Sequence, residues 1–396
     1  MTTGIFIKKY HIESICWWII NLILVFTFLF KQFTFLSNIA LLVLLICRYK
    51  TLQYSHKRSI ILCGLFVLFL SSYSIILHNN ISNIIRFSII LFFICAAYFL
   101  KLPKRILIPP LRFSALALSI ILILGEFYMI FFFDRSNSAL LRNFLISNGL
   151  GDIYPKYGFF YAIQLVGTAA LPFIFMLSFI ENSLFKNNKW FCRILLFSGV
   201  IIAGNFGFLV AIFFFLFCIY SSVKTTYRSL LNKIIILSVF FIMAGPYIFN
   251  FVSKTLESKK EESNAIRIDQ ASVLMNDMSS NVGTLIFGTG VGHTLDVKTR
   301  FRDYTDNVYY ELQSLYFLNQ MGILFFLLFI LINIYFAFKY IAFPKLLLLY
   351  LSYILYAITN PYILNTNQVV VIITLASLCY SYKKNNEPAD QLSLHI

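Results

Sequence analysis

The sequence predicts an all-α polytopic membrane protein whose chain crosses a lipid bilayer about twelve times. Of its 396 residues, 60% are hydrophobic and only 12% are charged, which is about half the charged fraction of an average soluble domain. Apolar windows of about 17 to 25 residues, the length of a spanning helix, recur along nearly the whole chain. Lipid offers no hydrogen-bond partners to the backbone, so we expect these spans to be helices.

Eleven apolar segments set the expected order of the spans, and we expect each to be helical. They cover residues 14–30, 33–47, 59–77, 84–100, 106–133, 158–180, 194–222, 234–251, 309–338, 346–359 and 368–382.

The segment over residues 194–222 is too long for a single crossing, since a helix of that length would extend roughly 43 Å. Both of its flanks are basic, with Arg193 before it and Lys224 and Arg228 after it. Two short spans joined at Gly204-Asn205-Phe206-Gly207 bring both flanks to the same side of the membrane. This division raises the expected number of spans to twelve.

With twelve spans, both termini and the basic connectors fall on one side, as the positive-inside rule expects of a cytoplasmic face. Together they hold 19 of the 32 Lys and Arg residues. These connectors cover residues 48–58, 101–105, 181–193, 223–233 and 339–345. The net charge of +16 therefore indicates membrane topology. We expect no nucleic-acid partner, because no polar domain carries a basic stripe interleaved with aromatic residues.

Two long polar loops, 134–157 and 252–308, fall on the opposite face and are the expected place for chemistry. Residues 1–251 form a first membrane bundle of about nine spans, which includes the loop 134–157. A large extracytoplasmic loop over 252–308 follows, and then three last spans and a cytoplasmic tail over 309–396. We expect the first span to be retained, because no small-residue cleavage site follows it.

The seven cysteines lie in or beside apolar segments, and no Cys-x-x-Cys pair occurs. We therefore expect neither a disulfide framework nor a zinc site. No other residue pattern points to a metal or a cofactor.

The second long loop contains a helical stripe, which predicts a short amphipathic helix packed on the membrane bundle. Its apolar residues follow the spacing i, i+3, i+4, i+7. They are Ala271, Leu274, Met275 and Met278.

Three alternate glycines follow on the same loop, at Gly288, Gly290 and Gly292. Alternate glycines let backbone N–H groups approach a ligand closely, which suits phosphate oxygens. A tight turn with a purely structural role is the alternative.

Basic side chains surround these glycines along the chain. Arginine forks match phosphate oxygens in pairs, so an anionic ligand is one interpretation of this charge, and a solvated loop is the other. The residues are Arg267, His293, Lys298, Arg300 and Arg302.

Two acidic residues are candidates for proton transfer. Glu311 begins the apolar segment after the second long loop, where partial desolvation would suit a general base; an ion-paired helix start is the alternative. Glu126 lies about eight residues inside a predicted span, where acids are functional candidates. A pairing of Glu126 with Arg86 or another polar group is the alternative.

Across 56 residues of the outer loop and the following span, the order of features resembles the O-antigen polymerase and O-antigen ligase superfamily of bacterial envelopes. In that family a loop arginine precedes a Phe-Gly-x-Gly-x-Gly turn, and a His-Asn-x-Tyr-Leu-x-x-Leu-x-Glu-x-Gly type segment begins the next helix. Arg267 matches the arginine, Phe287–Gly292 matches the turn, and Glu311–Gly322 matches the start of the helix. Leu315 and Leu318 fall at the family's spacing.

This sequence also departs from the family pattern. Glu311 stands where ligases place a histidine, which favours the polymerase branch. Asn205-Phe206-Gly207 stands where many relatives carry Ser-Arg-Gly, so an arginine that often contacts substrate is missing. Asn360-Pro361-Tyr362, before the last span, resembles a common ending of these polymerases.

The resemblance implies a metal-independent, membrane-embedded glycosyltransferase that polymerises surface polysaccharide at the periplasmic face of the bacterial inner membrane. The donor would be a glycan on undecaprenyl pyrophosphate, and the acceptor a hydroxyl of a newly flipped repeat unit. The expected partners are these lipid-linked oligosaccharides, the bilayer and a protein that regulates chain length.

The resemblance also implies roles for individual residues. Glu311 is the expected base, with His293 in reserve because histidine titrates near neutrality. The residues expected to bind pyrophosphate are Arg267, Arg300 and Arg302, together with Gly288, Gly290 and Gly292.

Other functions stay open at this point. A ligase that transfers the finished glycan to the lipid A core would share nearly every feature. A flippase for the lipid-linked sugar would carry buried polar residues along several spans and inverted repeats, and a polytopic acyltransferase would carry a His and Asp pair at the membrane plane. The sequence shows none of these features clearly.

Overall fold

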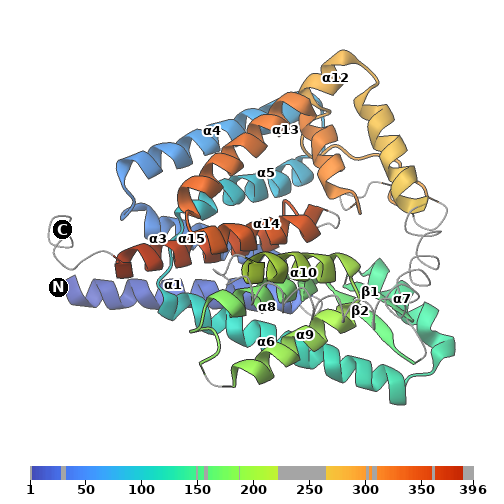
Figure 1. Cartoon of the computed structure of the whole chain (residues 1–396). Coiled ribbons are helices and arrows are strands. Elements are labelled where there is room, and N and C mark those ends of the chain that lie inside the picture. The colour runs from blue at the N-terminus through green and yellow to red at the C-terminus, as the bar shows by residue number, and fades with distance from the viewer. Residues whose placement is uncertain are drawn as a thin grey trace.

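A computed structural model describes residues 2–27, 33–148, 150–155, 159–186, 188–221, 265–299, 303–305, 310–358 and 362–386. This part of the chain is mostly helical (Figure 1). Four of its helices are long and apolar enough to cross a membrane, over Tyr54–Ile76, Ile81–Phe99, Lys104–Phe131 and Gln313–Tyr340. The fold therefore agrees with an all-α membrane protein, and the expected span over 234–251 lies outside the described residues.

The N-terminal helices pack against one another in pairs. Helices α1 (Thr2–Val25) and α3 (Thr34–Tyr49) lie side by side, as do α4 (Tyr54–Ile76) and α5 (Ile81–Ala96). Asn80 begins α5, because its side chain accepts hydrogen bonds from the first N–H groups of the helix. Trp17, which is fully buried in α1, donates its indole N–H to the Leu107 carbonyl at 3.0 Å and joins α1 to α6.

Helix α6 (Lys104–Phe131) leads into a small unit that contains a sheet. This unit contains helix α7 (Ser138–Ser147) and a two-stranded antiparallel sheet of β1 (Gly151–Pro155) and β2 (Tyr161–Leu165). In the register of the sheet, Ile153 lies opposite Ile163.

The sheet corrects the prediction of a helix over residues 158–180. Only α8 (Ala170–Ile180) is α-helical there, and a short 3-10 segment joins it to β2. The physical reason is local pairing: the backbone of Tyr161 donates to the buried Glu126 carboxylate at 2.8 Å, and β2 then pairs with β1. Gly167 follows β2 and packs so closely that an added Cβ would lie 2.7 Å from the Leu24 carbonyl oxygen.

The predicted division of the long apolar segment at residues 204–207 is confirmed. Helix α9 (Lys189–Ala203) ends before Gly204, whose φ of 66° lies in the left-handed region, and α10 (Phe206–Ser221) begins two residues later. The Asn205 side chain accepts from the Gly207 N–H at 3.0 Å and starts the new helix.

The C-terminal part contributes a helix over residues 265–278, then α12 (Val282–Phe287), α13 (Gln313–Tyr340), α14 (Pro344–Ile358) and α15 (Thr366–Asn386). Helix α15 is buried from Val369 to Cys379. The Ser377 hydroxyl accepts from the Leu102 N–H at 2.8 Å, which ties α15 to the segment before α6. Helix α13 is broken at Gly322, where φ is 65°.

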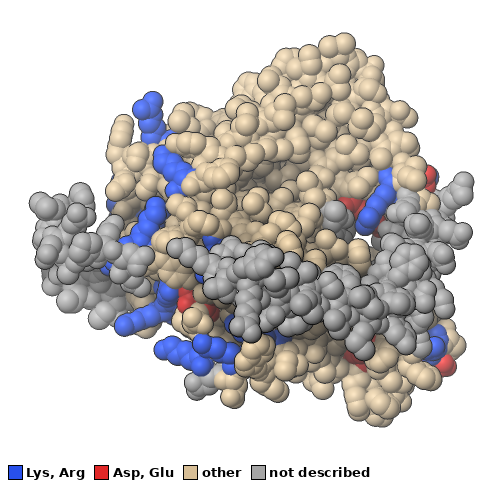
Figure 2. Space-filling view, viewed as in Figure 1, with Lys and Arg blue, Asp and Glu red and all other residues tan. Residues whose placement is uncertain are grey.

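Basic side chains gather at the end of the molecule where α1 begins and α15 ends (Figure 2). Two ion pairs stabilise this end, Arg48 with Glu13 and Lys104 with Glu181. The helix over 265–278 and α12 lie at the opposite end (Figure 1). The described basic connectors therefore share one end, as their grouping in the sequence predicted.

Candidate functional site

The helix over 265–278 lies on the start of α13 and carries most of the site. Its buried positions are Ile266, Gln270, Leu274 and Met278, one turn apart. The predicted stripe is therefore correct at Leu274 and Met278 and wrong at Met275, which is 47% exposed. The buried face of the helix is rotated relative to the predicted stripe, because it includes the fully buried polar residue Gln270. A hydrophobic pattern cannot reveal such a residue.

An ion pair joins this helix to the residue just before α13. The Nε atom of Arg267 lies 3.3 Å from Oε2 of Glu311, although the two residues are 44 positions apart. Their side chains are 37% and 20% exposed, so the pair is partly desolvated but still open to a ligand. The structure thus brings together the predicted base and one predicted pyrophosphate ligand.

Two glutamines fix the backbone on either side of Glu311. Gln270 accepts from the Leu312 N–H at 3.3 Å, and Gln313 accepts from the Tyr310 N–H at 3.2 Å. Glu311 is therefore held from both sides in a turn before the helix begins. Neither glutamine was predicted as a site residue from the sequence, and the signal for Gln270 is its position three residues after Arg267, on the same face of the helix.

The glycine turn packs directly against α13. Gly288, Gly290 and Gly292 have φ values of 82°, 88° and 89°, which only glycine adopts readily. A Cβ at Gly288 would lie 2.2 Å from the Gln320 carbonyl oxygen, so the turn also needs glycine for space.

The N–H groups of these glycines are all used inside the protein. Gly288 donates to the Thr284 carbonyl at 2.9 Å, Gly290 to the Gln320 carbonyl at 2.9 Å, and Gly292 to the Gln320 side-chain oxygen at 3.3 Å. This geometry agrees with the alternative stated above, a tight turn with a purely structural role. The donors expected to approach a phosphate have protein acceptors here.

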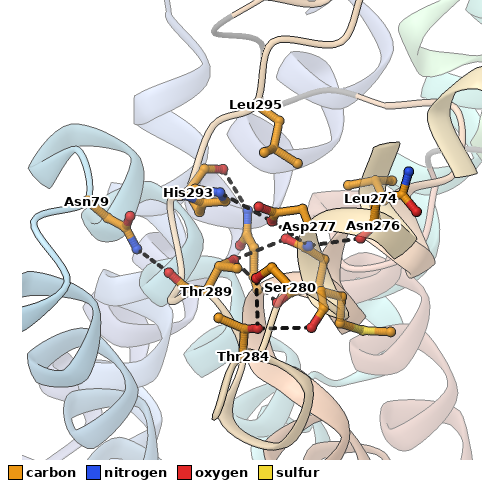
Figure 3. A network of polar contacts seen from close by, with 12 residues as sticks. Asn79, Leu274, Asn276, Asp277, Ser280, Thr284, Thr289, His293 and Leu295 are labelled. Carbon is orange, nitrogen blue, oxygen red and sulfur yellow. Dashed lines mark hydrogen bonds and ion pairs between the residues drawn. The ribbon is translucent and has the colours of Figure 1, made fainter. Parts of the chain in front are cut away.

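A second polar cluster joins the same helix to the end of the glycine turn (Figure 3). Nε2 of His293 lies 3.4 Å from Oδ2 of Asp277, and the Asn319 amide donates to the same oxygen at 2.8 Å. The Thr289 hydroxyl donates in turn to the Asn319 side-chain oxygen at 3.0 Å. Partial burial alone would raise the pKa of Asp277, but the hydrogen bonds from His293 and Asn319 and the charge of His293 hold it below its usual range.

Helix α4 and the short segment that follows it hold the turn from its other side. The Asn79 amide donates to the Thr289 carbonyl at 2.9 Å (Figure 3), and the Tyr73 hydroxyl donates to the Gly288 carbonyl at 3.1 Å. The His293 carbonyl accepts from the hydroxyl of Tyr316 in α13. These contacts hold the backbone of the turn up to His293, and Asp277 of the helix over 265–278 contacts its ring.

The two ion pairs occupy opposite ends of one helix face. Arg267 and Asp277 are ten residues apart, which corresponds to about 15 Å of helix. A proton acceptor has to lie within about 3 Å of the hydroxyl that it deprotonates, so Glu311 and His293 are alternative candidates for the base, each paired at its own end of the helix. Arg300 and Arg302, the other predicted pyrophosphate ligands, lie outside the described residues.

Glu126 is buried and accepts from the backbone of Tyr161, so local structure accounts for this acid. Across the residues that the structure describes, no three His, Cys, Asp or Glu side chains are placed to hold a metal ion. No protein-family model, curated protein or solved structure matches the chain.

Proposed function

We propose that this chain is a polymerase of lipid-linked glycans of the O-antigen polymerase type. In this proposal twelve spans cross the bacterial inner membrane, with the basic end in the cytoplasm and the helix over 265–278 in the periplasm. The observation that carries the proposal is the contact of Arg267 with Glu311, at the end of the molecule opposite the basic connectors. The family resemblance assigns both of these residues to the reaction.

The reaction needs a base and a cation. Glu311 takes the proton from the acceptor hydroxyl as that oxygen forms a bond to the anomeric carbon of the donor. The bond from the anomeric carbon to the pyrophosphate breaks, and its electron pair leaves with the pyrophosphate. Arg267 stabilises the charge on this leaving group, and in the absence of substrate it is held in place by Glu311.

The remaining predicted residues take supporting roles. Arg300 and Arg302 are proposed as further cations for the pyrophosphate. The glycines, whose N–H groups donate within the protein, are proposed to shape the turn on which substrate rests. His293 remains the reserve base, and its pairing with Asp277 would orient the ring.

The proposal is tested by deleting the gene in its native host and complementing it with variants. Wild type should restore a ladder of long surface polysaccharide on a gel, whereas Glu311→Gln and Arg267→Gln should leave core plus one repeat unit. Asp303→Asn is the matched control, because Asp303 is an exposed acid of the same loop.

Each other outcome has a definite meaning. An unchanged ladder in the deletion strain would exclude the proposed function. Complete loss of glycan from the core would favour the ligase or the flippase. A full ladder with Glu311→Gln and none with His293→Gln would move the role of base to His293.

A further inference from the structure

A groove lies between α1 and α6, far from the site described above. Its volume is about 390 Å³, and its walls include Trp18 of α1 and Pro109, Phe113 and Leu116 of α6. The rings of Trp18 and Phe113 meet edge to face at 5.6 Å. Figure 1 shows the two helices side by side, with their first residues at the basic end.

Arg112 is the one charged residue in the lining of this groove. Its side chain is exposed, and within the described part of the chain it has no hydrogen-bond or ion-pair partner. Two other cations of this end differ, because Arg48 pairs with Glu13 and Lys104 pairs with Glu181. Glu13 and Glu181 are both buried, so neither carboxylate is accessible to Arg112.

The position of Arg112 along α6 fixes the depth of its charge. It lies eight residues, or about 12 Å of helix, after Lys104. An unpaired arginine at this depth on an apolar helix is unfavourable in hydrocarbon. Its long side chain can extend toward the headgroup layer while its stem stays on the apolar wall. A negatively charged ligand at the level of the headgroups would pair with the guanidinium of Arg112.

We infer that this groove binds one anionic phospholipid of the leaflet at the basic end. The guanidinium of Arg112 takes the phosphate in paired hydrogen bonds, and an acyl chain lies along Trp18 and Phe113. The inference needs only the membrane location of the helices and does not depend on the proposed glycan reaction.

Trp18 makes the inference testable, because a bromine atom quenches tryptophan emission only on contact. The full-length protein is placed in phosphatidylcholine vesicles that contain a small fraction of brominated phosphatidylglycerol or, in parallel, brominated phosphatidylcholine. We expect phosphatidylglycerol to bind in the groove with about five-fold higher affinity than phosphatidylcholine. This ratio corresponds to about 1 kcal/mol, the contribution of one cation at an anionic surface.

Three variants identify the site. Trp18→Phe should remove the additional quenching that brominated phosphatidylglycerol causes relative to brominated phosphatidylcholine. Trp17 and Trp190 continue to report the folded state in this variant. Arg112→Gln should remove the preference between the two lipids, and Arg58→Gln, which changes an exposed cation of the same end, should keep it.

Equal quenching by the two lipids in the wild type would overturn the inference. Excess quenching that survives in Trp18→Phe would overturn it as well, because the lipid would then lie elsewhere. The comparison of wild type with Trp18→Phe decides the question without the Arg112 variant.

Discussion

Replacing Gly288 with alanine tests how the glycine turn is held against α13. The new Cβ would lie 2.2 Å from the Gln320 carbonyl oxygen, and backbone atoms cannot yield as a side chain can. Separating the segments would break the Thr289 N–H bond to the Asn319 carbonyl and the Gly290 N–H bond to the Gln320 carbonyl, each worth about 1 kcal/mol. The φ of 82° adds about 1 kcal/mol for a residue with a side chain. We therefore expect a loss of about 3 kcal/mol in the free energy of unfolding.

The assay is thermal melting of the purified protein in detergent, where the expected loss corresponds to a midpoint lower by roughly 4 °C. Gly64→Ala is the control, because Gly64 lies inside α4 and its new Cβ would meet only the Phe92 ring at an ordinary 3.6 Å. That variant should match or slightly exceed wild type. A Gly288→Ala protein that melts with the wild type would refute the packing described here.

Further variants test three single interactions. Because hydrogen bonds hold the pKa of Asp277 below its usual range, its carboxylate stabilises the fold above that range and loses this contribution as the pH falls through the lowered value. Acidification from about pH 6 to about pH 3 should thus lower the melting midpoint of wild type more than that of Asp277→Asn, and equal shifts would contradict this. Glu126→Leu should lose about 1 to 3 kcal/mol in melting experiments by removing the acceptor of the Tyr161 N–H, whereas Glu126→Gln keeps an acceptor oxygen and should melt close to wild type. Lys104→Ala should lose about 3 kcal/mol by leaving the buried Glu181 carboxylate without its cation, and Glu181→Gln should lose clearly less; equal losses would argue against the ion pair.

The sequence predicted a mostly helical chain with helices long and apolar enough to cross a membrane, because the bilayer imposes simple rules on helix length and composition. The helix break at Gly204 followed from the length of the segment 194–222, which is too long for a single crossing, and from the basic residues on both of its flanks. The strand β2 was missed because Tyr161–Leu165 is as apolar as a membrane span. Its pairing with β1 depends on contacts that hydropathy does not record.

Some members of the candidate site were predicted from the sequence, but none of their contacts was. The family resemblance pointed to Arg267 and Glu311, yet nothing in the sequence placed them 3.3 Å apart. Asp277 was not predicted, because it lies beside an apolar stripe whose spacing indicates only packing. Its spacing of three residues from Leu274 was the available signal that it shares the inner face of the helix.

The most direct test of the proposed function follows the glycan while it is still on its lipid carrier. Lipid-linked glycans are extracted from a strain that lacks the ligase and this gene, after complementation with wild type, Glu311→Gln or Asp303→Asn, and their length is measured by mass spectrometry. We expect multiple repeat units on the carrier with wild type and Asp303→Asn, and a single repeat unit with Glu311→Gln at equal protein level. Multiple repeat units on the carrier in the strain without this gene would contradict the assignment as a polymerase.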